Sequence, residues 1–448
     1  MDMKKSPSKQ NKSKQKSQTE TIVSRILGKQ IYIELLYAPR LERTVLGLWK
    51  DGKFEVVSTY THGKDKTLIP VKPSNNLIKH GVVLLPSYAE DYGNTAKLIK
   101  NIQSFIHKYC DLGEQFETVA TYYVLMSWVY DRFRELPYLR MQGDFGTGKT
   151  RFLQVIGSLC YKPLFASGAS TISPIFHTLD MFRGTLVMDE ADFRFSDEKA
   201  DIIKILNNGN MNGFPLLRSE VSKSGTYNPR AFQVFGPKIL ATRGAYSDPA
   251  LESRIITKRA KTGNIRRDIP LTLPEGFETD AETLRNKLLM FRFKNWHNII
   301  IDAHTTNNQT SNRISQIFKP LLVLAQDAQA KAVIHDYAKE SDNILSTARA
   351  FSPEEHVLQV IYDLMNKNIT PLSIKAITSK YQLKYGGEHT TPVTPKWIGS
   401  VLRNKLHLGT VKRQGVYIIA ETEQPRLNAL FNRYGISTNK QIARPEHK

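Results

Sequence analysis

The stretch "RMQGDFGTGKTRF", residues 140–152, places three glycines, a lysine and a threonine at fixed spacings. Its centre, "GDFGTGKT", has the spacing GxxxxGK[ST] of a phosphate-binding loop. Such a loop needs glycines because its backbone must turn tightly and present N–H groups to phosphates at the start of a helix. The flanks agree, since "YLRMQ" predicts a strand and "KTRFLQVIGSLC" predicts a helix. The sequence therefore predicts an α/β fold in which this loop joins a strand to a helix.

The loop predicts a nucleotide site with ATP and Mg²⁺ as cofactors. Lys149 would reach the β- and γ-phosphates, and the Thr150 hydroxyl would ligate Mg²⁺. We expect the nucleotide to contact the whole loop, namely Gly143, Asp144, Phe145, Gly146, Thr147, Gly148, Lys149, Thr150 and Arg151.

A second part of the site is predicted forty residues after Lys149, where "GTLVMDEAD" ends an apolar strand in two carboxylates. Asp189 would hold the Mg²⁺ through water, and Glu190 would polarise the attacking water. An apolar run before two acids is common by itself and usually marks a strand entering a loop. After a phosphate loop, it predicts the second half of one catalytic site.

A third strand, "GPKILATRG", ends in Thr242, and "ALESRIIT" follows with Arg254 twelve residues after that threonine. A hydroxyl at the tip of a strand between the two nucleotide-binding strands can orient the hydrolytic water. Arg254 carries a permanently charged fork that can neutralise transition-state charge on the γ-phosphate of a neighbouring subunit. The alternative for Arg254 is an arginine at the exposed end of a helix.

In this order and spacing, "GDFGTGKT", "GTLVMDEADF", "GPKILATRG" and "LESR" resemble the AAA+ ATPases, in particular the MCM-like helicases of bacterial mobile elements such as staphylococcal cassette chromosomes. The resemblance covers about residues 100 to 335. It implies a doubly wound parallel sheet with a helical lid, hexameric rings, ATP at subunit interfaces and DNA in a central pore. The resemblance also implies roles for individual residues: Lys149 and Thr150 in the P-loop, Asp189 and Glu190 as the acidic pair, Thr242 as sensor 1, Arg254 as the finger, and Arg313 in "SNRISQIFKPLLVLA" as the lid-helix arginine that senses nucleotide. The alternative for Arg313 is a capping or solvated arginine.

Between the acidic pair and the third strand, "FPLLRSEVSKSGTYNPRAFQVFGPK" predicts two short strands joined by a turn. In ring helicases of the resembled type, a hairpin at this place enters the pore and carries a basic residue to the DNA backbone, which would be Lys223 here. The alternative is a surface hairpin, because Lys and Gly are ordinary turn residues. The chain also departs from true MCM proteins, since residues 161–184 leave no room for an extra hairpin and the N-terminal region lacks zinc-binding cysteines.

Composition agrees with a nucleic-acid partner. The 448 residues include 63 Lys and Arg against 42 Asp and Glu, a formal net charge of +21, which suits a polyanion. No run of about 18 apolar residues and no signal-peptide pattern occurs, so we expect a cytoplasmic protein without a membrane partner. The two cysteines, Cys110 and Cys160, exclude a disulfide framework and a cysteine-rich zinc site.

The C-terminal third predicts a winged helix. "EEHVLQVIYDLMNK" places apolar residues on one helical face, and "TPKWIGSVLRNKL" begins a second helix with a Thr394 cap. A hairpin, "GTVKRQGVYIIA", follows with Gln414 and Gly415 at its tip. The residues expected to face DNA are Lys396, Arg403, Lys405, Lys412 and Arg413. The alternative is a winged helix that contacts proteins.

The chain is accordingly predicted to contain a disordered basic tail (1–28), a β-rich N-terminal domain (29–94), an AAA+ ATPase core (95–275), a helical lid (276–350), a winged-helix DNA-binding domain (351–425) and a C-terminal tail (426–448). Within the β-rich domain, strands are expected in "KQIYIELLYA", around the Asp51-Gly52 turn, and in "HGVVLLPSY" at residues 80–88.

Three functions compete at this point. The first is an ATP-driven DNA helicase or translocase that acts as a homo-hexameric ring on single- and double-stranded DNA, with other replication proteins of the same element as further partners. The second is an ATPase that loads a helicase or remodels DNA without processive unwinding. The third is a DNA-binding initiator that does not hydrolyse ATP. The presence of Glu190 and Arg254 argues against the third function.

Overall fold

The computed structural model describes residues 18–28, 30–63, 66–191, 197–221, 227–246, 248–260, 266–302, 310–350, 352–386 and 392–436. By its internal contacts the chain separates into two compact units, residues 1–339 and 340–448. Among the described residues, no helix is both long and apolar enough to span a membrane.

Unit 1 is built on a five-stranded sheet in the order β14-β8-β13-β10-β9, with every neighbouring pair parallel. Its strands are β8 (Tyr138–Gln142), β9 (Leu164–Ala166), β10 (Leu186–Met188), β13 (Lys238–Thr242) and β14 (Ile255–Arg259). The β13 strand is buried along its whole length, as expected for a parallel strand covered on both faces. The predicted α/β fold is confirmed, and the strand in "YLRMQ" has the predicted bounds.

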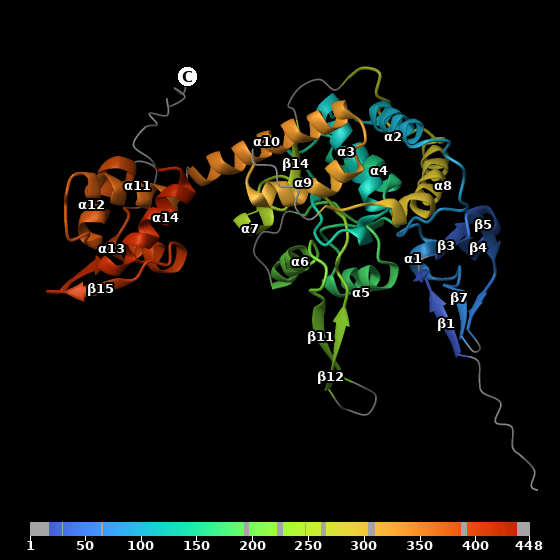
Figure 1. Ribbon diagram of the computed structural model, residues 1–448, viewed down its shortest axis with the longest axis horizontal. Helices are drawn as coiled ribbons and strands as arrows, with labels where there is room; N and C mark the ends of the chain where they lie inside the picture. The colour runs from blue at the N-terminus through green and yellow to red at the C-terminus, as the bar shows by residue number, and fades with distance from the viewer. Residues whose placement is uncertain are drawn as a thin grey trace, which may run out of the picture. The chain divides into compact units, whose positions relative to one another are not determined.

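Helices surround this sheet, and α4 lies closest to its centre. The α4 helix packs against β8, β10 and β13, and also against α2, α3 and α8. The α5 helix packs against α6 and β12 at the root of a hairpin (Figure 1). The helices of this unit are α2 (Thr95–Tyr109), α3 (Glu114–Ser127), α4 (Lys149–Leu159), α5 (Ile172–Phe182), α6 (Asp197–Asn208), α7 (Pro249–Glu252), α8 (Phe277–Asn295) and α9 (Asn312–Leu324). A further helix, α10 (Ala328–Ala350), crosses the boundary between the units.

The N-terminal part of unit 1 holds two small sheets. One is antiparallel, in the order β2-β3-β4-β5, and the other has the order β1-β7-β6. The predicted turn at Asp51 and Gly52 is confirmed, because both residues have positive φ, 50° and 77°, between strands β4 and β5. The elements are β1 (Gln18–Ile22), β2 (Ser24–Leu27), β3 (Ile31–Ala38), β4 (Arg43–Lys50), β5 (Lys53–Val57), β6 (Tyr60–His62), β7 (Lys66–Pro70) and the short helix α1 (Asn76–Lys79).

Two predictions for this region are wrong. The tail predicted to be disordered through residue 28 contributes β1 and β2, because its polar backbone finds hydrogen-bond partners in β7 and β3; residues 1–17 lie outside the described residues. The strand predicted at 80–88 is absent apart from an isolated bridge between Val83 and Leu164. Apolar side chains there pack into the core of unit 1 without a continuous ladder.

A buried ion cluster joins the N-terminal sheet to the parallel-sheet core. The Glu34 carboxylate on β3 lies 2.7 Å from the Lys162 ammonium and 3.0 Å from the Arg292 guanidinium on α8. Arg292 also pairs with Asp131 at 2.7 Å. The charges of Glu34, Lys162 and Arg292 satisfy one another away from water, which makes their burial tolerable, whereas Asp131 is partly exposed. Breaking one member would leave an uncompensated charge in the interface between the two sheets.

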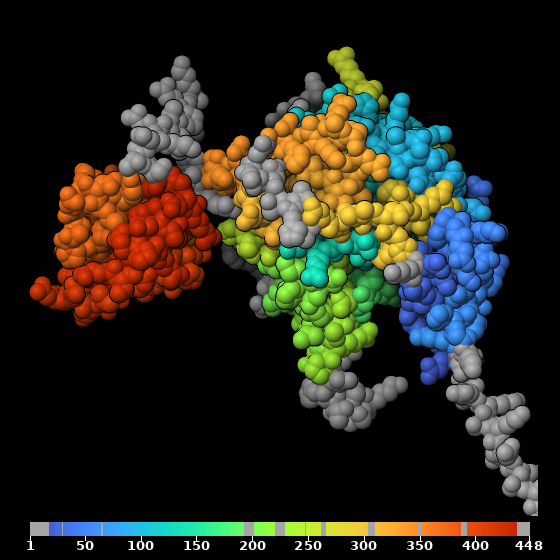
Figure 2. Space-filling model, viewed as in Figure 1, coloured from blue at the N-terminus to red at the C-terminus, as the bar shows by residue number. Residues whose placement is uncertain are grey.

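A hairpin of β11 (Leu216–Val221) and β12 (Tyr227–Phe232) projects from the body of unit 1 (Figure 2). It lies between α6 and β13 in the chain, where the sequence predicted two short strands. Lys223 lies outside the described residues.

Unit 2 packs helices and a hairpin around one apolar core. Its elements are α11 (Pro353–Asn366), α12 (Ile374–Tyr385), α13 (Pro395–Ser400), which continues as a π-helical turn (Val401–Lys405), the hairpin β15 (Thr410–Arg413) and β16 (Val416–Ile419), and α14 (Gln424–Tyr434). The predicted cap is confirmed, because the Thr394 hydroxyl accepts the Trp397 N–H at 3.3 Å. The prediction of a tail from residue 426 is wrong as far as Tyr434, since Leu427 and Phe431 of α14 are buried in the core.

Candidate functional site at the two ends of the parallel sheet

The glycine-rich loop leaves the carboxyl end of β8 and leads directly into α4, which begins at Lys149. Gly146 and Gly148 have φ values of 73° and 82°, in the left-handed region that other residues adopt only at a cost. The Gly143 N–H donates to the Thr242 carbonyl at 3.0 Å. The loop is therefore attached to the end of the neighbouring strand β13.

Lys149 turns back over this loop. Its ammonium donates to the carbonyls of Gly143 and Asp144 at 2.8 and 2.6 Å, and the Thr147 hydroxyl donates to the same Asp144 carbonyl at 2.7 Å. The positive charge of Lys149 is thus held at the mouth of the loop, beside the amino terminus of α4. Both the ammonium and the helix end favour an anion at this place.

The acidic pair lies just beyond the end of β10 and meets the loop. The Thr150 hydroxyl donates to the Asp189 carboxylate at 2.8 Å, so the two predicted Mg²⁺ ligands are in contact. The exposed Glu190 has a φ of 49°, and its N–H donates to the other oxygen of Asp189 at 2.8 Å. Left-handed backbone at a residue other than glycine is a strained conformation that concentrates at functional sites.

Thr242 ends β13 between the strands that precede the loop and the acidic pair. Its side chain is fully buried, and among the described residues its hydroxyl has no hydrogen-bond partner. The neighbouring Ala241 carbonyl accepts the Ala191 N–H at 2.9 Å. The carboxyl edge of the sheet therefore gathers the loop, the acidic pair and Thr242, which the sequence had predicted as parts of one site.

Arg254 lies at the opposite end of the sheet. Its carbonyl accepts the N–H of Tyr138, the first residue of β8, at 2.9 Å, whereas the loop follows the last residue of that strand. Its guanidinium donates to the Asn207 amide oxygen at 2.6 Å, and Asn207 in turn donates to Asp248 at 3.0 Å. The Nε–H of Arg254 is buried without a partner among the described residues.

Arg313, at the start of α9, is on the same side as Arg254 rather than beside the loop. Its guanidinium lies 3.3 Å from the Glu135 carboxylate, and Glu135 precedes β8. Burial and the nearby positive charge of Arg254 lower the pKa of Arg313, while Glu135 opposes that change. The predicted lid arginine is thus grouped with the predicted finger.

One buried pair that sequence patterns did not reveal supports this arrangement. Arg140 in the middle of β8 makes two hydrogen bonds, of 2.6 and 2.7 Å, to the carboxylate of Glu252 on α7. Because Glu252 lies two residues before Arg254, the pair attaches the segment that carries Arg254 to strand β8. The available signal was a charged residue inside an otherwise apolar strand, "YLRMQ".

In unit 2, all five predicted DNA-facing residues are exposed. Three of them have neighbours on the same unit. Arg413 pairs with Glu421 at 2.9 Å, Arg403 donates to the Thr410 hydroxyl at 3.3 Å, and the Lys412 ammonium lies 5.9 Å from the centre of the Tyr417 ring. Lys412 and Arg413 lie on β15, and Arg403 and Lys405 on the π-helical turn after α13. The hairpin tip at Gln414 and Gly415 has positive φ at both residues, as a tight turn requires.

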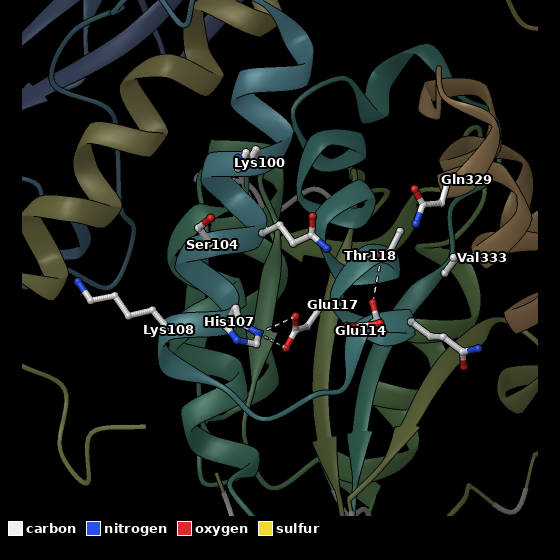
Figure 3. Close-up of a pocket in the computed structure, with 11 residues that line it drawn as sticks. Lys100, Ser104, His107, Lys108, Glu114, Glu117, Thr118, Gln329 and Val333 are labelled. Atoms are coloured by element: carbon white, nitrogen blue, oxygen red, sulfur yellow. Dashed lines mark hydrogen bonds and ion pairs between the residues drawn. The ribbon is translucent and has the colours of Figure 1, made fainter. Parts of the chain in front are cut away.

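An open cleft of about 560 Å³ lies between α2, α3 and α10, away from the predicted site residues (Figure 3). In it the His107 imidazole faces the Glu117 carboxylate at 3.0 Å. The cleft is lined by Lys100, Gln103, Ser104, His107, Lys108, Glu114, Gln115, Glu117, Thr118, Gln329 and Val333. Its lining contains neither the glycine-rich loop nor the acidic pair.

The fold and the loop define an α/β protein with a parallel sheet and a phosphate-binding type of loop at its carboxyl edge. No family model matches the sequence, and no curated protein matches it. Solved structures similar to this chain include the apo NrS-1 C-terminal region (11% identity, 87% of this chain and 96% of that chain, TM-score 0.37) and the SCCmec type IV Cch active helicase (11%, 92% and 81%, TM-score 0.39). A full-length MCM homolog from Methanopyrus kandleri is also similar (10%, 71% and 70%, TM-score 0.32).

These neighbours include an SCCmec helicase and an MCM homolog, the kinds of protein that the motifs resembled. Since each TM-score lies below 0.5, the function proposed next rests on the geometry of the site.

Proposed function

We propose that this protein is an ATP-hydrolysing DNA helicase of the MCM-like AAA+ type, in which each ATP is hydrolysed between two subunits of a ring. The observation that carries the proposal is the division of the site: the phosphate loop, the acidic pair and Thr242 share the carboxyl edge of the sheet, and Arg254 occupies the amino edge. A ligand of an open α/β sheet binds at the carboxyl edge, so Arg254 can serve only a neighbouring subunit's site.

The residues at the carboxyl edge fit a magnesium nucleotide. The buried Thr242 hydroxyl has no hydrogen-bond partner within the described part of the chain, which is costly unless it hydrogen-bonds to something in the functional state. The contact between Thr150 and Asp189 supplies one hydroxyl and one carboxylate, which is a common protein share of a Mg²⁺ site completed by phosphates and water. When bound, Mg²⁺ would neutralise the charge that develops on the phosphates.

Each residue has a proposed task at this edge. Lys149 leaves the loop carbonyls to hold the terminal phosphates, Glu190 accepts a proton from or orients the attacking water, and Thr242 donates to or accepts from that same water. The loop residues from Gly143 to Arg151 surround the phosphates. The Glu190 side chain is exposed, and Asp189 accepts a hydrogen bond from the Glu190 backbone N–H, which supports an approach of the Glu190 carboxylate to water.

The amino edge supplies positive charge to the next copy. Arg254 lies close enough to Arg313 to lower the pKa of its guanidinium, and the Glu135 carboxylate faces Arg313. The carboxylate near Arg254 is Asp248, which is joined to it through Asn207. The permanently charged fork of Arg254 is held by the neutral Asn207 amide, and such a fork suits a phosphate from another subunit. This arrangement supports an oligomer, proposed to be a hexameric ring, in which one copy's arginines complete the next copy's site.

DNA contact is proposed for two places. The helices α11 to α13 and the hairpin β15–β16 support a winged-helix domain whose exposed basic residues Lys396, Arg403, Lys405, Lys412 and Arg413 face phosphate. The β11–β12 hairpin is proposed to enter the ring's pore, with Lys223 touching the DNA backbone. The net charge of +21 agrees with a polyanionic partner.

The proposal is tested by comparing Glu190→Gln with Lys149→Ala. Glu190→Gln should bind ATP as the wild type does but hydrolyse it at least about a hundredfold more slowly, because the amide cannot take up a proton. Lys149→Ala should lose affinity as well, because it removes the charge that faces the phosphates. Nucleotide binding and phosphate release are measured on both variants, and wild-type turnover by Glu190→Gln would contradict the assignment.

Unwinding separates the helicase from its alternative, a loader or DNA-remodelling ATPase. The wild type should displace a strand from a duplex with a 3′ or 5′ tail in an ATP-dependent way. Lys223→Ala should hydrolyse ATP and bind DNA almost normally while losing strand displacement. If the wild type hydrolyses ATP but displaces no tailed strand, the loader function replaces the helicase.

A further inference from the structure

An arginine at the rim of the phosphate loop has no task in the hydrolysis proposed above. Arg243 directly follows Thr242, and its guanidinium carbon lies 3.7 Å from the centre of the Phe145 ring. Phe145 stands within the glycine-rich loop and is 74% exposed. A side chain so exposed contributes little to the core, so the apolar ring in this loop is not explained by packing.

The two residues approach each other because their strands are neighbours. Gly143, at the start of the loop, is bonded to the Thr242 carbonyl, so Arg243 leaves β13 beside the point where the loop leaves β8. Arg243 is exposed, and its guanidinium stacks over a ring that belongs to the loop itself. The positive charge is therefore kept on the same side of the sheet as Lys149.

The contact orders a flexible side chain before a ligand arrives. A cation over an aromatic ring gains about 0.5 to 1 kcal/mol at an exposed site, which restricts the many rotamers of arginine. A group that is already ordered loses less entropy when it binds, so its contact with an anion becomes stronger. The planar fork of arginine also matches two oxygens of one phosphate.

We infer that Arg243 binds the terminal phosphate of a nucleoside triphosphate held by the loop of its own subunit, and that Phe145 is a positioning residue for its guanidinium. The inference rests on the proposed nucleotide site and adds a selectivity to it: the pair favours a triphosphate over a diphosphate. Arg254 and Arg313 would then serve the neighbouring copy, while Lys149 and Arg243 serve their own.

The test measures dissociation constants of the full-length protein for ADP with Mg²⁺ and for a non-hydrolysable ATP analogue with Mg²⁺. Arg243→Gln should weaken the analogue about tenfold while leaving ADP within about twofold, because the lost hydrogen bonds are charge-assisted. Phe145→Leu should weaken the analogue about threefold, as expected from the loss of the ring contact. Phe145→Tyr keeps a ring and should weaken the analogue less than Phe145→Leu does.

Two further variants make the test specific. Arg259→Gln removes an exposed positive charge at the same sheet edge, opposite Gln142, and should change both affinities equally and slightly. Phe145→Leu combined with Arg243→Gln should be no weaker than Arg243→Gln alone, since Phe145 acts through Arg243. Thermal unfolding checks that each variant is folded.

Several results would overturn the inference while the proposed function stands: equal losses for ADP and the analogue in Arg243→Gln, no loss in that variant, or a loss from Phe145→Leu that persists without Arg243. Failure of the wild type to bind either nucleotide would instead remove the proposed function, and the inference with it.

Discussion

The two ends of the parallel sheet carry opposite halves of the proposed catalytic site. At the carboxyl end, Lys149 folds over loop carbonyls and Thr150 contacts Asp189. At the amino end, Arg254 is held by Asn207, and Arg313 by Glu135. The carboxyl end thus holds the groups proposed to bind a magnesium nucleotide, and the amino end holds two neighbouring arginines, with Glu135 facing Arg313 and Asp248 joined to Arg254 through Asn207.

Because the two ends of the sheet carry different groups, one copy of the chain is not a complete enzyme under the proposed function. Five residues of β8 separate the two ends, a rise of about 13 Å at roughly 3.3 Å per residue. An arginine side chain anchored to Asn207 cannot cover this distance to its own loop. A second copy that places its amino end against the first copy's loop would complete the site.

The largest expected effect comes from breaking each end in turn. Arg254→Ala and Lys149→Ala should each lower ATP turnover by about a thousandfold or more, since each removes a charge that stabilises the transition state. When the two inactive variants are mixed, activity should partly return, because some interfaces pair an intact loop with an intact arginine. ATP turnover of the mixture is the measurement.

Arg254→Lys is the matched control for this mixing experiment, because it keeps the charge and loses the fork. It should remain well below wild-type turnover. If mixed oligomers form, as shown by tagged co-purification, and activity still does not return, the two ends do not belong to a shared site.

A second prediction tests whether the amino end of the sheet can be destabilised without a change at the carboxyl end. The buried Lys238 ammonium, at the amino end of β13, donates to the carbonyls of Gly209, Val234 and Gly236 at 3.1, 2.9 and 3.0 Å. Lys238→Met removes these bonds and should lower the free energy of unfolding by about 2 to 3 kcal/mol. Urea unfolding measures it, and Lys204→Met, an exposed lysine on α6, should cost under about 1 kcal/mol.

The second prediction also concerns the ATP affinity and the ATP turnover of Lys238→Met. Gly209 follows α6, the helix that presents Asn207 to Arg254. Lys238→Met should therefore reduce turnover more than ATP binding, although Lys238 and Thr242 share one strand. If ATP affinity falls as much as turnover does, then a change at the amino end also disturbs the carboxyl end, and the prediction is wrong.

The same lysine predicts a dependence of stability on pH. Burial lowers the pKa of Lys238 from 10.5 to about 7. Between these values the unfolded chain binds one more proton than the folded chain, so this residue makes stability rise with pH, by up to about 1.4 kcal/mol per unit. Below pH 7 both states are protonated and its contribution is constant. The free energy of unfolding of the wild type minus that of Lys238→Met, measured with urea, should be larger at pH 9 than at pH 7. The same difference at both pH values would contradict the prediction.

The smallest effects are expected at Arg313. Arg313→Ala should reduce ATP turnover about tenfold without weakening binding to the variant's own loop, because its guanidinium is on the side of Arg254. Glu135→Gln should change turnover by less than about threefold, as expected for a partly exposed ion pair. If isolated Arg313→Ala subunits lose ATP affinity, then Arg313 contacts the nucleotide of its own subunit, as the resemblance implied for the lid arginine.

Local patterns were sufficient for the elements that carry the carboxyl end. Glycine spacing predicted the loop, apolar runs predicted β8, β10 and β13, and their polar ends marked Asp189 and Thr242. These signals are local because tight turns and strand ends impose their residue types within a few positions. The cap at Thr394 and the turn at Asp51 were predictable for the same reason.

Local sequence patterns predict which residues end the strands. The packing of the whole unit sets which strand ends lie next to each other. The order of the strands does not follow their order in the chain. Arg140 pairs with Glu252 more than a hundred positions later, and Arg313 lies near Arg254 although their elements do not follow each other in the chain. The strands β1 and β2 lie in the part of the chain that was predicted to be a disordered basic tail, yet β7 and β3 complete their backbone hydrogen bonds. Hydrophobic periodicity has no information about such partners, because they are chosen by the packing of the whole unit.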